Sequence, residues 1–262
     1  SETILVDRHT CFGCGIRCKR SVKVDGRYEV DQKYGGPEYE TLASFGSNCG
    51  INDLEAIAKA NEICNSHGLD TISAGVSISF AMECFERGLI TERDTGGLLL
   101  KFGNADAMLK MLIQIVERRG LGRLLGEGVK RAAEKIGKGS EEFAIHVKGQ
   151  EVPMHEPRLK KGLGIGYVVS PTGADHCHNL HDTLFQSQTS AMKEIQALGF
   201  LEPLKTNALN PEKMRLLVYA SNWRHFTNCA VICYFTPWEY SNTPSLVNAV
   251  TGWNTTTWEL MK

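Results

Sequence analysis

Apolar residues recur at three- and four-residue spacing along most of the chain, which is typical of helices with one buried face. The clearest example begins after the capping residues Asn52 and Asp53 and closes at Gly68, so we expect a helix between them. Its apolar positions are Leu54, Ile57, Ala58, Ile63 and Cys64. By the same criteria we expect helices within 71–88, 91–102, 104–120, 122–137, 187–199, 211–222 and 244–251.

Strand-like alternation is limited to short pieces. The stretch 22–30 predicts a hairpin around Asp25 and Gly26, within a first 50 residues that otherwise look irregular. Residues 141–153 also alternate and end in a proline, which suggests a domain boundary near there. The second half opens on what we expect to be a Gly-rich loop, 160–179. The predicted fold is therefore mainly α, with two helical domains at 1–146 and 147–262.

Composition narrows the class of protein. The chain has 262 residues, a formal net charge of −1, and no apolar run of the roughly 18 residues that a membrane span needs, so neither a nucleic-acid partner nor a membrane span is expected. Its nine cysteines are odd in number and unevenly spread, which argues against a disulfide framework and favours a reducing, cytoplasmic location. Because it begins at Ser1 without Met and ends inside a predicted helix, we expect a fragment of a longer protein.

Cys11, Cys14 and Cys18 form a Cys-x-x-Cys-x-x-x-Cys run. Structural zinc would need a second pair of ligands, and no other Cys-x-x-Cys occurs. A [4Fe–4S] cluster often takes three thiolates from one loop and a distant fourth, which Cys229 or Cys233 offers here. The run is also the reverse of the radical-SAM spacing. We therefore favour an iron–sulfur cluster over zinc and over three merely buried thiols.

Two further stretches, "GGPEYETLASFGSNCGINDLEAIAKANEICNSHGLDTIS" and "RLKKGLGIGYVVSPTGADH", resemble the tungsten-containing aldehyde ferredoxin oxidoreductase family. The resemblance extends over essentially the whole chain. It implies a tungsten (or molybdenum) ion between two molybdopterin dithiolenes, beside a [4Fe–4S] cluster that passes electrons to ferredoxin. The family's β-rich N-terminal domain has no counterpart here, so we expect the isolated fragment to be inactive.

Site residues follow from the resemblance. The implied cluster ligands are Cys11, Cys14, Cys18 and Cys233. The family's two pterin-binding turns, of pattern Asp-x-x-Gly-Leu-(Cys/Asp), match 65–70 and 228–233, with Asn in place of the leading Asp in both and Val-Ile in place of Gly-Leu in the second. The matching positions are Asn65, Gly68, Leu69, Asp70, Asn228, Val231 and Ile232.

The resemblance also places Glu40 and His176 beside the metal, where a carboxylate and an imidazole could activate water and move protons. Taken alone, Glu40 could be a surface carboxylate or a helix cap, and His176 a buried, hydrogen-bonded histidine. His178 and His181 stand nearby, but their spacing suits no single helical face, so a separate zinc site is not expected. The family's iron-bridging Glu aligns with Lys59, which puts a homodimer bridged in that way in doubt.

Cys49 has two interpretations. It is either a buried thiol, as we assume for Cys64 and Cys84, or a direct metal ligand, as the benzoyl-CoA reductase branch of the family implies. The leading hypothesis is aldehyde oxidation to a carboxylic acid with ferredoxin as acceptor. The alternatives are a tungsten subunit that reduces an aromatic acyl-CoA and works with an iron–sulfur subunit, an electron-relay subunit without pterin, and a zinc-stapled interaction module.

Overall fold

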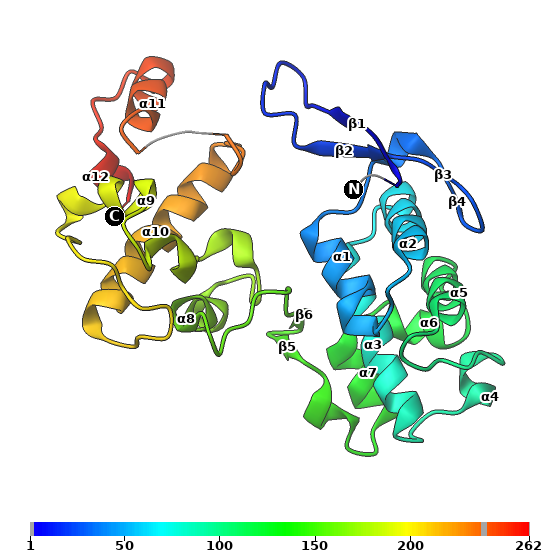
Figure 1. The fold of residues 1–262 in the computed structure, drawn as a ribbon. Coiled ribbons are helices and arrows are strands. Elements are labelled where there is room, and N and C mark those ends of the chain that lie inside the picture. Colours follow the sequence, from blue (N-terminus) through cyan, green and yellow to red (C-terminus); the bar gives the residue numbers. More distant parts are fainter. Residues whose placement is uncertain (1–2, 237–239, 262) are drawn as a thin grey trace. The chain divides into compact units, whose positions relative to one another are not determined.

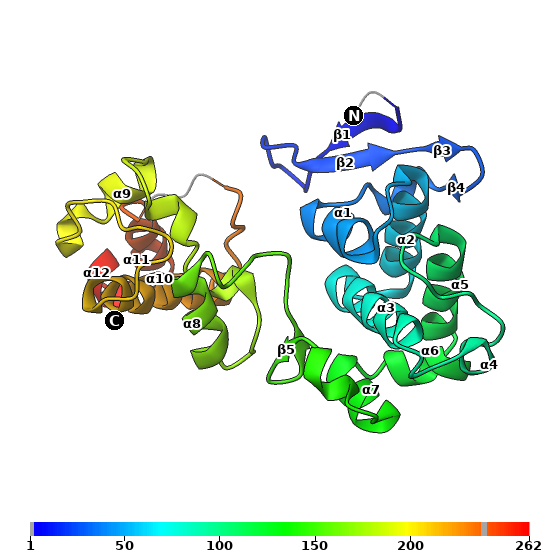
Figure 2. The same cartoon turned by 60° about the horizontal axis from the view of Figure 1, so that its bottom comes forward.

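The computed structural model describes residues 3–236 and 240–261, and it divides the chain into two compact units. Unit 1 comprises residues 1–154 and unit 2 residues 155–262 (Figures 1 and 2). Both units are built mainly from helices, which confirms the predicted fold class. The domain boundaries proposed above, 1–146 and 147–262, stay a prediction, because compact units and family domains need not share a boundary. None of the described helices combines the length and hydrophobicity that a bilayer span requires.

Unit 1 contains all of the described strands, each in a two-stranded antiparallel pair. The pairs are β1 (Leu5–His9) with β2 (Lys19–Val22), β3 (Val24–Asp25) with β4 (Glu29–Val30), and β5 (His146–Val147) with β6 (Gln150–Glu151). The β3–β4 pair is the predicted hairpin. Val22, Val24 and Val30 pack on Ala58 of α2, which seats these strands on the helical core.

The helices of unit 1 enclose a large core, and a smaller apolar cluster lies beneath the first strands. They are α1 (Tyr39–Phe45), α2 (Leu54–His67), α3 (Thr71–Glu86), α4 (Glu92–Thr95), α5 (Ala105–Val116), α6 (Gly120–Leu125) and α7 (Val129–Ile136). Short 3-10 turns lie at Gln32–Tyr34, Ser47–Cys49 and Ser140–Phe143. Residues 74–82 of α3 are all buried, so this helix lies at the centre of the core.

Helix α2 has the predicted limits, because Asp53 accepts hydrogen bonds from Glu55 N and Ala56 N, and Gly68 ends the helix at φ 66°. The helix expected within 91–102 is wrong beyond Thr95, since Gly96 and Gly97 adopt left-handed φ and end it. The helix expected within 122–137 is divided into α6 and α7, because Gly128 has φ 88°.

Helix α1 was not predicted, and it lies close against α3. A Cβ atom at Gly75 would lie 2.7 Å from Cβ of Ser44, so only glycine allows the two backbones to approach this closely. Glu40 lies in the first turn of α1. The contact between α1 and α3 therefore fixes where Glu40 emerges.

Unit 2 is arranged around the longest helix, α10 (Pro211–Cys229), which extends past the predicted end at residue 222. The other helices are α8 (Lys161–Val169), α9 (Ser190–Glu194), α11 (Thr243–Thr251) and α12 (Thr257–Leu260). Short 3-10 turns lie at His176–His178, Asp182–Phe185 and Gln196–Leu198. The helix expected within 187–199 is thus split into α9 and a 3-10 turn, and α11 agrees with the prediction.

The Gly-rich segment is not the loop that we expected, since its first part forms α8. The glycines serve close packing. A Cβ at Gly162 would lie 2.7 Å from Oδ1 of Asp182, and one at Gly166 would lie 2.4 Å from Oδ1 of Asn179. Sequence spacing cannot distinguish such a helix from a flexible loop, because the need for glycine comes from the neighbouring segment.

Candidate metal and cofactor site

The three clustered cysteines lie on the loop between β1 and β2. Cys11 and Cys18 are exposed, Cys14 is half-buried, and all three are free thiols. The loop is tightened by a hydrogen bond from Cys14 N to Cys11 O of 3.1 Å and by a left-handed Gly13 at φ 68°. The strands therefore present three accessible thiols from one short loop, which is the arrangement that a multi-thiolate metal site requires.

The segment 65–70 forms the junction of α2 and α3. The N–H of Leu69 donates to Cys64 O at 2.9 Å, which together with the left-handed Gly68 makes a Schellman-type helix end. Asp70 then caps α3 by accepting from Ile72 N and Ser73 N. The Asn65 amide donates to Tyr34 O at 2.8 Å, so this side chain is engaged within unit 1.

The surroundings of this turn leave space for a ligand. A Cβ at Gly68 would meet nothing within 4 Å. Leu69, Asp70 and Ser73 border a cavity of about 100 Å³ that continues to Gly126 and Gly128. Backbone and carboxylate groups are thus exposed beside an open space within unit 1.

The segment 228–233 makes a similar helix end in unit 2. Helix α10 stops at Cys229, Val231 has φ 56°, and the N–H of Ile232 donates to Thr227 O at 2.9 Å. A β-branched residue is strained at this φ, which explains in physical terms why the family pattern has glycine here. Cys229 and Cys233 are both exposed free thiols. Cys233 lies in the other unit from the Cys11–Cys18 run, so the four-thiol set stays a prediction.

Cys49 is completely buried in the core of unit 1. Its Sγ lies 3.3 Å from Ser44 O and 3.7 Å from Gly75 O, and it can donate to both carbonyls. Burial raises the pKa of the Cys49 thiol to about 12. A metal ligand at this position would have to lose that proton and leave these contacts. Cys64 and Cys84 are also buried, as assumed from the sequence.

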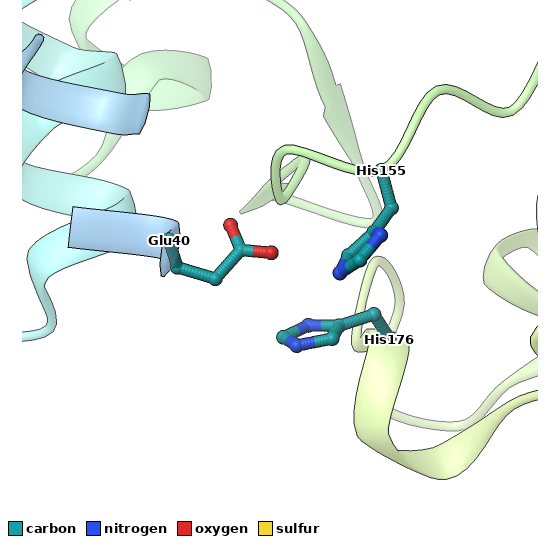
Figure 3. A group of neighbouring side chains, drawn as sticks. All are labelled: Glu40, His155 and His176. Carbon is teal, nitrogen blue, oxygen red and sulfur yellow. The ribbon is translucent and has the colours of Figure 1, made fainter. Parts of the chain in front are cut away.

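Glu40 projects from the first turn of α1 (Figure 3). Its Oε2 accepts a hydrogen bond of 2.8 Å from Met154 N, and the neighbouring Tyr39 hydroxyl donates to Met154 O at 2.9 Å. These two bonds tie the start of α1 to the end of the segment that follows β6. The carboxylate is half-buried and held in place, which is more than a surface carboxylate would show.

His176 belongs to a cluster of three imidazoles in unit 2. The ring centres of His155 and His176 are 4.8 Å apart, and that of His181 lies 4.9 Å from His155 (Figure 3 shows the first two). Lys160 Nζ lies 3.0 Å from His155 Nδ1. Sequence reasoning missed His155, because it lies outside the resemblance stretches and only the fold brings it to His176.

His178 contacts a different pair of residues. Its ring stacks on His225 with the centres 5.1 Å apart, and its Nδ1 lies 2.7 Å from Oδ2 of Asp175. Asp175, His176 and Cys177 also bring their ligand atoms within 4.8 Å of one another, so this turn offers a small set of metal-ligating groups.

His181 is held in its neutral form. Burial is the main cause that lowers its pKa to about 4, and electrostatic interaction with His155 and Lys160 lowers the pKa further. Its Nε2 lies 3.0 Å from His176 O, and a carbonyl can only accept, so Nε2 carries the proton. His181 therefore positions the backbone of His176 without carrying a charge.

We expect this histidine to make unit 2 less stable in acid. The unfolded chain binds a proton at His181 near pH 6.5, whereas the folded chain binds it only near pH 4. The contribution of neutral His181 to the free energy of unfolding is therefore complete above pH 6.5 and is lost as the pH falls from 6.5 to 4. The loss is on the order of 3 kcal/mol. Histidine-labelled NMR should show the lowered midpoint, and His181→Asn should flatten the pH dependence of unfolding. His67→Asn, an exposed histidine of unit 1, is the control. A His181 midpoint near 6.5 would contradict this assignment.

A buried ion pair supports the histidine segment. Lys213 of α10 and Asp182 have fully buried side chains, and Lys213 Nζ lies 2.5 Å from Oδ1 of Asp182. The Asp182 carboxylate also accepts from Gly162 N and Leu163 N, the first turn of α8. The segment that carries His176 and His181 is thus anchored between α8 and α10.

Comparison with known proteins agrees with the resemblance. The family model "Aldehyde ferredoxin oxidoreductase, domains 2 & 3" matches residues 1–262. The tungsten-containing aldehyde ferredoxin oxidoreductase of Pyrococcus horikoshii is 32% identical over 266 aligned residues, which cover 98% of this chain and 40% of that protein. An aliphatic sulfonate oxidoreductase WOR-like subunit of Pyrococcus furiosus is 38% identical over 172 residues, 63% of this chain and 27% of that protein.

Among solved structures, the active-site complex BamBC of benzoyl-coenzyme A reductase, determined with 1,5-dienoyl-CoA, shares the fold with a TM-score of 0.73. The match has 20% sequence identity and covers 99% of this chain and 43% of that chain. The present chain spans about 40% of the length of the aldehyde ferredoxin oxidoreductases that it matches. With a family model matched along its whole length, the chain belongs to the aldehyde ferredoxin oxidoreductase family, whose domains 2 and 3 it represents.

Proposed function

We propose that this chain is the part of a tungsten-dependent oxidoreductase that holds the cluster and much of the cofactor site, and that the enzyme oxidises aldehydes to carboxylic acids with ferredoxin as electron acceptor. The observation that carries the proposal is the β1–β2 loop, which presents three accessible, free thiols in a member of this family. Cys233 is proposed as the fourth thiolate of a [4Fe–4S] cluster.

The two helix ends are proposed as the pterin-binding turns. Both finish in a left-handed residue, Gly68 and Val231, which changes the direction of the chain at the helix end. The open space at Gly68 and the cavity beside Asp70 fit a flat, polar group there. A tungsten ion held by two pterins would supply two-electron redox chemistry at low potential.

Glu40 and His176 are proposed to handle protons during the reaction. A carboxylate can accept a proton from the attacking water, and an imidazole can accept or donate one near neutral pH. The hydrogen bonds from Met154 N to Glu40 and from His181 to His176 O hold both residues in place before substrate arrives. Preorganisation of this kind lowers the cost of orienting the catalytic groups.

Cationic side chains surround the cysteine loop. Arg8, Arg17, Lys19 and Arg20 are exposed, and Arg17 and Arg20 pair with Asp7 and Glu38. Phe12 at the loop is fully exposed. We propose this surface as the place where an acidic ferredoxin docks, because opposite charges speed such encounters.

A second candidate function is the reduction of an aromatic acyl-CoA, which would use Cys49 as a metal ligand. The Cys49 thiol is buried and contacts Ser44 O, so a metal at this position would have to replace that contact. An iron–sulfur relay without pterin is the remaining alternative.

Metal and pterin analysis of the native protein, purified without oxygen, tests the proposal. We expect four irons, one tungsten and two pterins per chain, and oxidation of aldehydes but not reduction of benzoyl-CoA. Cys233→Ser should lose the iron, whereas Cys229→Ser, an equally exposed thiol on the same helix end, should keep it. Iron without tungsten or pterin would favour the relay, and zinc in place of iron would refute the cluster.

A further inference from the structure

Unit 2 contains a cavity of about 150 Å³ that the proposed chemistry does not use. It lies between the 179–185 segment, α9, α10 and the residues that follow α10. Phe185, Trp223 and Tyr240 line it, and Trp223 and Tyr240 meet edge to face with their ring centres 4.7 Å apart. A cavity of about this volume is large enough for one benzene-sized ring, and its walls here combine aromatic with polar side chains.

Arg224 is the cation that lines this cavity. Its guanidinium carbon lies 3.7 Å from the centre of the Tyr234 ring, which holds the planar group in place by stacking. Within residues 3–236 and 240–261, the guanidinium N–H groups of this half-buried side chain make no hydrogen bond. A guanidinium with spare donors in a partly buried position favours a carboxylate, which it can bind through two parallel hydrogen bonds.

Among the described residues, two titratable side chains line the cavity besides Arg224 and the tyrosines. Glu194 already has a partner of its own, so it is not a free ligand group. His181 is neutral near pH 7 and therefore adds no positive charge. Arg224 is thus the one described lining residue whose donors remain available for an anion.

We propose that this cavity binds a single-ring aromatic carboxylate, with the ring against Trp223 and Tyr240 and the carboxylate on the guanidinium of Arg224. The cavity has the size and the aromatic walls to hold one ring. The unused N–H donors of Arg224 favour an anionic group on that ring. A ring-bearing carboxylate would also be the product of oxidising a ring-bearing aldehyde. That link to substrate class rests on the proposed function, whereas the binding itself does not.

Titration of the purified full chain with benzoate tests the proposal, by calorimetry and by tryptophan fluorescence. We expect saturable one-to-one binding that is at least about tenfold weaker in Arg224→Gln. Arg215→Gln is the matched control, since Arg215 is also on α10 and also stacks on an aromatic ring, Phe200, but does not line the cavity. Benzyl alcohol, benzylamine and acetate should each bind more weakly than benzoate, because each lacks the anion or the ring.

Ala220→Leu provides a second variant that keeps the arginine but fills part of the cavity, and it should also weaken benzoate. Near-ultraviolet circular dichroism verifies that each variant is folded. Absence of saturable benzoate binding, equal binding by Arg224→Gln, or tighter binding of benzylamine would overturn the proposal. None of these outcomes changes the iron, tungsten or pterin content, so the proposed function is tested separately.

Discussion

Replacing Lys213 by methionine is expected to lower the free energy of unfolding of unit 2 by about 3–5 kcal/mol. The substitution leaves the Asp182 carboxylate buried without its cation, and Asp182 also anchors the first turn of α8. All four tryptophans of the chain lie in unit 2, so their fluorescence during urea unfolding reports on this unit.

Lys193→Met is the control for this prediction, because Lys193 is exposed on α9 and should change stability by less than about 0.5 kcal/mol. If Lys213→Met shifts the urea midpoint no more than Lys193→Met does, the ion pair does not have the structural role assigned to it. The same variant should also disturb the histidine cluster, since Asp182 directly follows His181.

On the proposed function, replacing Glu40 by glutamine, or His176 by glutamine, is expected to lower aldehyde turnover by about 10²–10⁴-fold without loss of iron or tungsten. Glutamine keeps an acceptor for Met154 N but cannot take up a proton, so Glu40→Gln separates proton transfer from positioning. The measurement is kcat of the native enzyme with a dye as acceptor, alongside its metal content.

Glu38→Gln is the matched control for the carboxylate, since Glu38 directly precedes α1, is exposed and pairs with Arg20 at 2.7 Å. His67→Gln serves the same purpose for the imidazole. Turnover that stays within a few-fold of the wild type in both Glu40→Gln and His176→Gln would show that neither residue handles protons in the rate-limiting step.

Where local signals were strong, the sequence predicted the elements well. The caps at Asp53 and Gly68 placed α2, and turn residues placed the β3–β4 hairpin. The helix predictions failed at glycines, because a glycine can either end a helix or allow a helix to pack closely on its neighbour. Gly96, Gly97 and Gly128 end helices, whereas Gly162 and Gly166 allow α8 to pack closely on its neighbours.

In the candidate site, too, the sequence predicted local features but not contacts between distant segments. The cysteine run and the two helix-ending turns are local motifs, so they could be recognised from spacing and resemblance. The partnership of His155 with His176 and the burial of Cys49 depend on contacts between distant segments, and no spacing in the sequence encodes them.

By itself the sequence determined the mainly helical class, the family, and the residue types available for metal and cofactor binding. These depend on short-range periodicity, capping and motifs, which a linear chain displays directly. The tertiary structure alone decided that Lys213 neutralises Asp182, that His181 stays neutral, and that Arg224 lines an aromatic cavity. The physical reason is that charge pairing, desolvation and cavity shape arise only when segments far apart in the chain pack together.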